Sequence, residues 1–401
     1  MKTSRIIATI AASFFIGGTL HAQAWKAKAI SDMKKGDFAK VEQTISKLSQ
    51  EEQNKHAWLI DSLQAMMSRI RDDFRLSREE GKKLLLEKVP GATDKQIDAW
   101  KQKKYLETRM IDGEERWFRK TISNFSLLNK DVYPAEIVQG KKKEYAKVHP
   151  MCEHILTQKL EENNTCDWKK VNATFYIEVP ADAVPAGETI KAWLPYPFDN
   201  GRQRNFQLLS SSSQAIHSSG SLHHTVYMEQ KAVKGQPTRF EMKFSYEVGA
   251  QVFHQADILN NLKPYDKQSN LYKKFTAQEL PHMLVNKQMK TLAQKIVGAE
   301  TNPVLQASLI YDWISANYPW AGAIDYSTIP CIPQYVLDIN HGDCGQVTLL
   351  YISMLRSLGI PARWESGWVF DESGWTGYHD WGEIYFEGTG WVPTDISAGR
   401  D

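Results

Sequence analysis

The residue with the clearest chemical potential is Cys344, in the segment H-G-D-C-G-Q at residues 341–346. An apolar stretch follows at once and predicts a helix that begins at the cysteine and ends before Gly359. The unpaired N–H groups and the dipole at a helix N-terminus favour negative charge, which suits a thiolate nucleophile. Gly342 and Gly345 add little bulk, so a substrate carbonyl could approach the backbone, and the Cys344 N–H could stabilise an oxyanion. Taken alone, this position could also hold a small buried cysteine.

A thiolate nucleophile needs an imidazole to exchange its proton and a third group to orient that imidazole. His379 lies at the start of an aromatic-rich predicted strand, Y-H-D-W-G-E-I-Y-F, and Asp395 ends the next one, W-V-P-T-D. Their separation is even, so one hairpin register would place both on the same face, but the sequence does not choose the register. Asp380 and Asp343 are weaker candidates for the orienting role, because each directly neighbours the residue it would serve and should point the other way.

A zinc site is the competing chemistry for the same residues. His341, Cys344 and His379 could supply ligands, with Asp395 or Asp380 completing the set. Zinc sites with so few thiolates usually have more closely spaced pairs of ligands. We therefore predict a Cys344–His379–Asp395 catalytic triad, with no metal ion and no cofactor.

The elements that must position these residues form an α+β pattern. One helix is expected between Pro303 and Pro319, and the helix after Cys344 follows it. Three strands complete the pattern: A-R-W-E-S-G-W-V-F, Y-H-D-W-G-E-I-Y-F and W-V-P-T-D, with Gly388-Thr389-Gly390 as the last turn. We assign residues 261–401 to one catalytic domain.

Two further regions are expected upstream, which makes the chain an α+β multidomain protein. Residues 25–165 are strongly charged and helical in pattern, with capping-box sequences at 77–80 and 93–96, and predict a helical accessory domain. Residues 166–260 alternate apolar and polar side chains between prolines, and predict a β-sandwich-like module.

The length and the first residues bound the size and the compartment. A chain of 401 residues should form two or three domains, and a net charge of +2 argues against nucleic-acid binding. Residues 1–24 match a signal peptide, with basic residues, a short apolar stretch and A-Q-A before a cleavage site after Ala24. The mature protein is expected to be periplasmic or secreted, without stable membrane insertion. Export permits disulfides, and the pairing among Cys152, Cys166 and Cys331 is left open.

The chemical motifs together carry a family resemblance. The segments G-D-C-G-Q, L-R-S-L-G-I-P-A-R, Y-H-D-W-G-E-I-Y-F and G-W-V-P-T-D resemble the transglutaminase-like superfamily of papain-type cysteine enzymes. The resemblance covers about residues 285–401. It implies Cys344 as the nucleophile, His379 as general base and acid, and Asp395 as the orienting group.

The resemblance also bears on the oxyanion site and on the reaction. In the family an aromatic residue upstream of the cysteine can complete the oxyanion site, and Trp320 and Tyr326 are the candidates here. Gly345 follows the cysteine, where the calcium-activated animal enzymes carry tryptophan, and no clustered acidic loop suggests a calcium site. Both departures favour hydrolysis over protein cross-linking.

The sequence therefore predicts an exported cysteine hydrolase, a peptidase or amidase, that cleaves extracytoplasmic peptide or protein amides through a thioester. Acyl transfer to an amine remains an alternative. The two reactions differ only in the acceptor of the acyl group, so the motif around the nucleophile does not distinguish them. A scaffold that binds peptide or glycan without turnover is the other alternative, because a fold does not fix a function.

Overall fold

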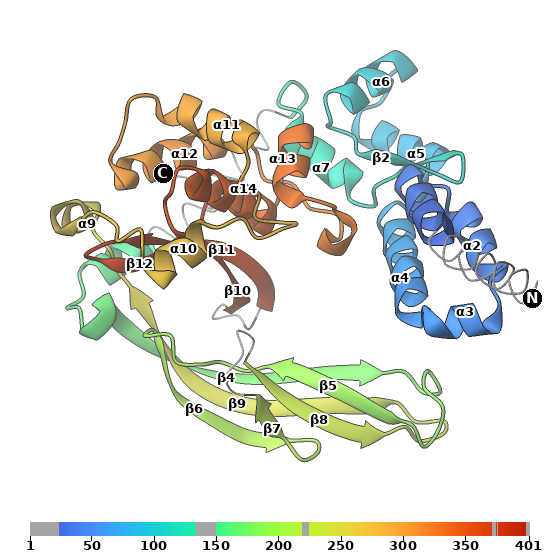
Figure 1. Cartoon of the computed structure of the whole chain (residues 1–401), viewed down its shortest axis with the longest axis horizontal. Coiled ribbons are helices and arrows are strands. Elements are labelled where there is room, and N and C mark those ends of the chain that lie inside the picture. Colours follow the sequence, from blue (N-terminus) through green and yellow to red (C-terminus); the bar gives the residue numbers. More distant parts are fainter. Residues whose placement is uncertain (1–23, 134–149, 219–223, 371–373, 375, 398–401) are drawn as a thin grey trace, which may run out of the picture. The chain divides into compact units, whose positions relative to one another are not determined.

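The computed structural model describes residues 24–133, 150–218, 224–370, 374 and 376–397 (Figure 1). The chain divides into two compact units. The first combines the chain up to Lys141 with Leu259–Asp401, and the second is Lys142–Ile258. The N-terminal helical region and the C-terminal domain thus belong to one unit. The division into domains at residues 165/166 and 260/261 stays a prediction. The predicted signal peptide lies, except for Ala24, outside the described residues. No helix within those residues is both long and apolar enough to cross a bilayer.

The N-terminal part of the first unit is mainly helical, and residues 24–35 form its first described helix. The helices that follow are α2 (Phe38–Ser46), α3 (Gln50–Lys55), α4 (Ala57–Asp73), α5 (Arg78–Lys88), α6 (Asp94–Gln102) and α7 (Thr121–Leu128). Both predicted capping boxes are confirmed. The Ser77 hydroxyl accepts from the Glu80 N–H while the Glu80 carboxylate accepts from the Ser77 N–H, and Thr93 and Gln96 do the same for α6.

A small sheet, which the sequence analysis did not anticipate, interrupts these helices. The sheet has the order β1-β3-β2, and its strands are β1 (Leu76–Ser77), β2 (Thr108–Ile111) and β3 (Glu114–Trp117). Asp112 and Gly113 join β2 to β3 with φ of 50° and 84°, the left-handed backbone of a tight hairpin turn. Trp117 at the end of β3 is fully buried against Leu85 and Phe125, so the hairpin belongs to the core of this region.

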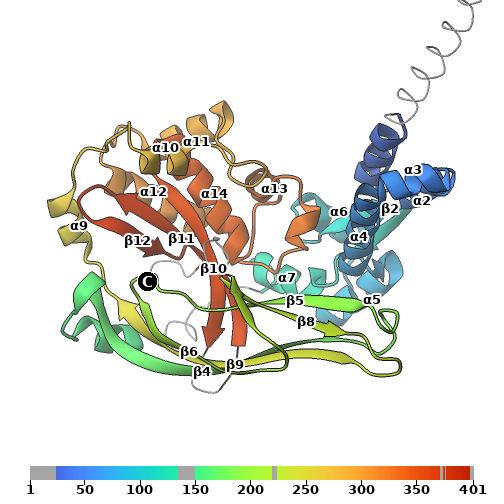
Figure 2. The ribbon, with the colours of Figure 1, turned by 60° about the horizontal axis from the view of Figure 1, so that its bottom comes forward.

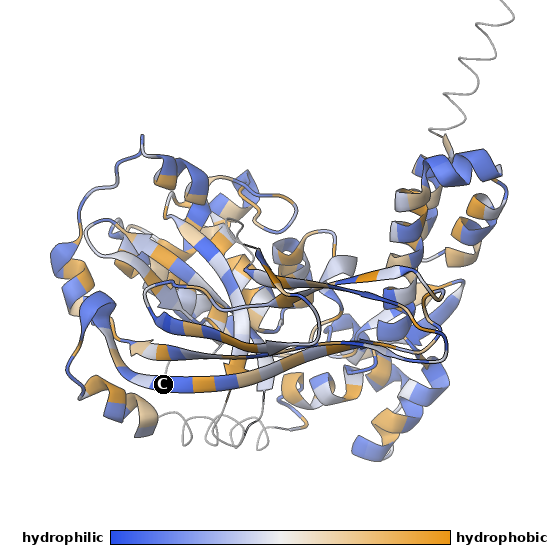
Figure 3. Cartoon of the chain, turned by 90° about the horizontal axis from the view of Figure 1, so that it is seen from below, coloured by the Kyte–Doolittle hydropathy of each residue, from blue (hydrophilic) through white to orange (hydrophobic). Residues whose placement is uncertain are grey.

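The second unit is built mainly from two three-stranded antiparallel sheets, with the orders β4-β9-β6 and β5-β8-β7, and also contains a helix at residues 150–156. Its strands are β4 (Thr165–Val179), β5 (Thr189–Pro195), β6 (Gln203–Ser211), β7 (Ile216–Ser218), β8 (Thr225–Lys231) and β9 (Thr238–Gln251). The alternation of hydrophilic and hydrophobic residues along these strands is visible in Figure 3. Leu194 and Met228 of one sheet share a core with Phe240 and Phe244 of the other, which confirms the sandwich-like arrangement.

The serine run 210–213 lies partly in a strand, because β6 extends as far as Ser211. Cys152 is exposed and Cys166 is buried, and neither forms a disulfide; Cys331 and Cys344 are also free thiols.

The C-terminal part of the first unit packs a three-stranded antiparallel sheet, in the order β10-β11-β12, against the helix α14 (Figure 2). The helices are α9 (Gln255–Asn261), α10 (Asn270–Thr276), α11 (Lys287–Val297), α12 (Pro303–Asn317), α13 (Ile332–Ile339) and α14 (Cys344–Ser357). The strands are β10 (Ala362–Phe370), β11 (Thr376–Phe386) and β12 (Gly390–Thr394). α14 contacts α10, α11, α12, α13, β10 and β11, and every residue after Cys344 in it is buried.

The predicted elements around the candidate nucleophile are confirmed. α12 lies between Asn302 and Tyr318, α14 begins at Cys344, and all three predicted strands are present. Gly388 turns the chain between β11 and β12 with φ of 94°, and a Cβ there would overlap the backbone carbonyl of Asn261. The tight turn joins β11 and β12 in a short hairpin. The segment that follows β12 therefore runs back alongside the earlier residues of β11.

Candidate active site

The N-terminus of α14 is fixed by its own capping box. The Asp343 carboxylate accepts from the Gln346 N–H at 3.2 Å, and the Gln346 side-chain oxygen accepts from the Asp343 N–H at 3.3 Å. Cys344 is therefore the first helical residue, and its side chain is partly exposed while the rest of the helix is buried. Asp343 caps the helix, which is a structural task beside the nucleophile.

His379 connects the other two residues of the predicted triad. Its Nε2 lies 2.6 Å from Asp395 Oδ2, and its ring also hydrogen-bonds the Cys344 side chain. The hydrogen bond to Asp395, followed by that to Cys344, raises the pKa of His379 to about 10. His379 therefore carries a proton at neutral pH. The chain thus brings Cys344, His379 and Asp395 together, with His379 between the other two.

Asp395 has partners for both of its carboxylate oxygens. Besides the contact of Oδ2 with His379, Oδ1 accepts from the Ser397 N–H at 3.0 Å and from the Ser397 hydroxyl at 2.7 Å. Burial alone would raise the pKa of Asp395, but the hydrogen bonds from His379 and Ser397 outweigh it and lower the pKa. Ser397 was not anticipated, although a D-x-S sequence is a known signal for such a turn.

The strand register explains why His379 and Asp395 meet. Gly382 pairs with Thr394, the last residue of β12, so Asp395 lies one residue beyond the paired segment. In the same register Trp381 is the position opposite Asp395, and His379 lies two residues before Trp381 on the same face of β11. The two side chains are diagonal neighbours on this face. The structure thereby provides the register that the sequence left open.

Residues 290–396 match the family model described as the transglutaminase-like superfamily. Residues 290–396 form a transglutaminase-like domain. An uncharacterized protein of Haemophilus influenzae is 27% identical over 165 residues, which are 34% of this chain and 43% of that protein. The uncharacterized protein YebA of Bacillus subtilis is 27% identical over 139 residues, which are 30% of this chain and 19% of YebA. The match therefore spans less than half of either relative.

Solved structures with a related arrangement are distant. A protein of Cytophaga hutchinsonii, provisionally named a cysteine protease, is 19% identical with a TM-score of 0.44, covering 58% of this chain and 77% of its own. The periplasmic domain of TgpA from Pseudomonas aeruginosa, bound to ethylmercury, is 13% identical with a TM-score of 0.29, covering 60% and 87%.

A further carboxyl group of the transglutaminase-like domain, Asp380, faces the nucleophile from the other side of β11. Its Oδ2 lies 3.9 Å from Cys344 Sγ. Burial, followed by the charge of Asp343, raises the pKa of Asp380 to about 6. Asp380 lies on the opposite face of β11 from His379, as strand alternation requires. This face of β11, the one with Asp380, packs against α14. The packing of α14 on β11 is a tertiary feature that no local sequence pattern predicts.

Both candidate oxyanion residues lie on the loop between α12 and α13. Trp320 pairs with Gly342 in a parallel bridge, and its side chain is 51% exposed. Tyr326 begins the short 3₁₀ helix η2 (Tyr326–Thr328), and its hydroxyl donates to Asp343 Oδ1. Burial and the Asp343 charge keep the pKa of Tyr326 well above its usual value, so its proton stays in place. An oxyanion role for either residue stays a prediction.

The space beside Gly345 is filled by the chain itself. A Cβ at this position would lie 2.5 Å from Asp380 Oδ2 and would also collide with the Tyr326 hydroxyl. The glycine lets Tyr326 and Asp380 pack on the first turn of α14, and the approach of a substrate carbonyl to this backbone stays a prediction. A tryptophan could not replace Gly345 without displacing both side chains.

His341 does not join Cys344, His379 and Asp395. It is buried, and it hydrogen-bonds the Lys104 backbone of the N-terminal helical region. Burial lowers the pKa of His341 to about 4, so the ring is neutral. Within the described ranges, no group of three or more His, Cys, Asp or Glu side chains is arranged to hold a metal ion.

Proposed function

We propose that this protein is a cysteine hydrolase that cleaves amide bonds of peptides or proteins. The observation that carries the proposal is the position of His379, which hydrogen-bonds Cys344 on one side and Asp395, at 2.6 Å, on the other. A protonated imidazole between a thiol and a carboxylate is the arrangement that activates a sulfur nucleophile and protonates a leaving amine.

The roles of the three residues in the reaction follow from this arrangement. The Cys344 thiolate attacks the amide carbonyl carbon, and the C=O electron pair moves onto the oxygen. The His379 imidazolium then gives its proton to the nitrogen as the C–N bond breaks, leaving a thioester on Cys344 and a free amine. The neutral His379 next takes a proton from water, whose oxygen attacks the thioester, and the acid leaves as the thiolate and imidazolium return. Asp395 keeps the ring oriented throughout.

The proposed place of action is outside the cytoplasm. The support is the predicted signal peptide at residues 1–24, which matches the exported class by its basic start, apolar stretch and A-Q-A site. The proposed substrates are accordingly extracytoplasmic peptides or proteins. Nucleic acid is not an expected partner, because the net charge is only +2.

The activation of Cys344 can be tested without a known substrate. Iodoacetamide alkylates a thiolate by displacing iodide, and peptide mass spectrometry measures the rate at each cysteine separately. Cys152, which is exposed, provides an ordinary reference thiol in the same molecule. We expect Cys344 to react at least tenfold faster than Cys152 at pH 7, because a thiolate paired with an imidazolium reacts faster than a thiol. Equal rates at the two cysteines would overturn the proposal.

The reaction itself can be tested with a pool of synthetic peptides that have blocked termini. Hydrolysis in ¹⁸O-labelled water should place one heavy oxygen in each new carboxyl group, and the Cys344→Ala variant should produce none. Adding a primary amine provides the comparison with acyl transfer. If the amine appears in the product and ¹⁸O does not, the enzyme is an acyltransferase and the hydrolase assignment is wrong.

A further inference from the structure

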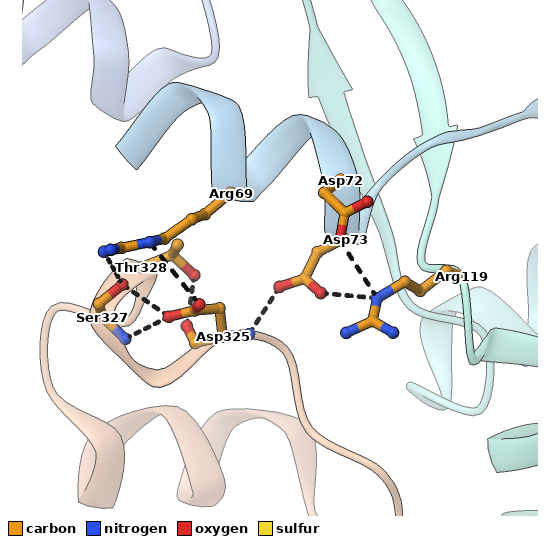
Figure 4. Close-up of polar contacts among 7 residues, drawn as sticks. All are labelled: Arg69, Asp72, Asp73, Arg119, Asp325, Ser327 and Thr328. Carbon is orange, nitrogen blue, oxygen red and sulfur yellow. Dashed lines mark hydrogen bonds and ion pairs between the residues drawn. The ribbon is translucent and has the colours of Figure 1, made fainter. Parts of the chain in front are cut away.

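The loop that borders the nucleophile is held from its far side by the N-terminal helical region. Asp73, the last residue of α4, is 1% exposed and belongs to the same compact unit as the loop. Its Oδ2 accepts from the Asp325 N–H at 2.6 Å, and its Oδ1 accepts from Arg119 Nε at 3.1 Å (Figure 4). One buried carboxylate thus joins the loop backbone to an arginine of the N-terminal region.

Two further contacts hold the same loop. Arg69, one turn before Asp73 on α4, donates from Nη1 to Ser327 Oγ at 2.9 Å (Figure 4). Asn124 on α7 pairs with Gly322 in both directions: its amide donates to the Gly322 carbonyl at 2.8 Å and its oxygen accepts from the Gly322 N–H at 2.9 Å. Backbone groups at both ends of residues 322–325 are therefore satisfied by N-terminal side chains.

The other side of this loop touches the start of α14. Tyr326 directly follows Asp325, and its hydroxyl donates to Asp343, the residue that caps α14. The same hydroxyl packs at Gly345, the residue after Cys344. A continuous series of contacts consequently leads from Asp73 through the Asp325 backbone and Tyr326 to the residues on either side of the nucleophile.

We propose that Asp73 is a positioning residue for Cys344, and that the N-terminal helical region is thereby a working part of the active site. Asp73 fixes the Asp325 backbone, which aims Tyr326 at Asp343 and Gly345. This inference rests on the proposed role of Cys344 as nucleophile. Without the Asp73 carboxylate, the Asp325 N–H and the Arg119 guanidinium lose a buried partner, and the loop would shift. Small displacements next to a reacting group reduce rates by up to about 10²-fold.

The test measures iodoacetamide alkylation of Cys344 in the full chain, with Cys152 as the internal reference. Asp73→Ala should slow alkylation of Cys344 about tenfold, within the range that misplacement produces. Asp73→Asn keeps one acceptor oxygen for the Asp325 N–H and should recover most of the rate. Asp32→Ala is the matched control, because Asp32 is also a buried carboxylate of the helical region but pairs with Lys28 at 2.6 Å; it should leave the rate unchanged.

A double-mutant cycle separates positioning from a general loss of stability. Tyr326→Phe removes the contact with Asp343, so after it the Asp73→Ala change should have little further effect on Cys344. The inference would be overturned if Tyr326→Phe and Asp73→Ala together slowed the alkylation of Cys344 by the product of their separate effects. It would also be overturned if Asp73→Ala reacted as fast as the parent. If Asp73→Ala does not fold, as judged by circular dichroism, Asn124→Ala takes its place with the same expected result. If Cys344 in the parent protein were alkylated no faster than Cys152, the proposed function would be wrong. The ratio of the Cys344 rates in variant and parent would still measure positioning.

Discussion

Two partly buried carboxyl groups on opposite faces of the β11–β12 hairpin have pKa values shifted in opposite directions. On one face, Asp395 receives hydrogen bonds from His379 and Ser397, and its pKa is lowered. On the other, Asp380 lies beside Cys344 and Asp343, and its pKa is raised to about 6. Burial acts to raise both pKa values; at Asp395 the hydrogen bonds from His379 and Ser397 outweigh it, whereas at Asp380 the charge of Asp343 adds to it. The carboxylate that contacts the imidazole is stabilised in its charged form, and the carboxyl group beside the sulfur is not.

The largest effect should come from the residue that joins the Asp395 face to Cys344. His379→Ala removes the proton donor for the leaving amine and should lower kcat/KM for peptide hydrolysis by about 10⁴-fold. Tyr378→Ala is the matched control on the same strand, because Tyr378 is 81% exposed, and it should stay within about twofold of the parent. A His379→Ala enzyme with near-parent activity would remove His379 from the mechanism.

The next largest effect should distinguish the role of Asp395 from that of Asp380. Asp395→Ala removes the main cause of the high His379 pKa, which should fall from about 10 toward its ordinary value, as measured by NMR titration of the imidazole. We expect kcat/KM to fall about 10²-fold, because the ring loses its orientation. Asp380→Ala should leave the His379 pKa high. If both variants lowered it equally, the distinction between the two faces would fail.

The packing around Asp380 can be disrupted by a larger residue at position 345. Gly345→Ala would force a Cβ against Asp380 Oδ2 and the Tyr326 hydroxyl, and should lower the free energy of unfolding by about 1–3 kcal/mol in urea titration. Gly382→Ala is the control, because its Cβ would meet Thr394 and Thr348 at the ordinary contact distances of 3.4 Å and 3.5 Å. Equal stability of the two variants would show that the packing at Gly345 is loose.

The smallest expected effect is a pH dependence. With its pKa raised to about 6, Asp380 is neutral below pH 5 and charged above pH 7, where its charge opposes the oxyanion that forms when Cys344 attacks. Asp380→Asn should therefore match the parent below pH 5 and exceed its kcat/KM by about threefold above pH 7. Asp338→Asn, at an exposed position of α13, should follow the parent profile throughout. A parent-like profile for Asp380→Asn would exclude this role.

Local patterns were enough to predict the elements around the nucleophile, but not the contacts between distant segments. The start of α14 at Cys344, the capping boxes and the strands of the last sheet follow from side-chain periodicity and turn residues. The D-G turn of the β2–β3 hairpin was also visible in the sequence, yet the surrounding helical pattern obscured it.

Three features of the site were beyond sequence reasoning for a physical reason. The face of β11 on which Asp380 meets α14 depends on how a helix packs on a sheet. The register that joins His379 to Asp395 depends on which strand pairs form. The contact of Asp73 with Asp325 spans 252 positions, and no local pattern encodes such a pair. Each depends on tertiary structure rather than on local propensity.

The discontinuous first unit has a consequence for the biogenesis of the protein. Asp73 and Asn124 are synthesised 252 and 198 positions before their partners in the loop, so they have no native contact there while the chain is still being made. Closing so long a separation is slow compared with forming local helices. Cys344 can therefore reach its final setting only after nearly the whole chain has emerged.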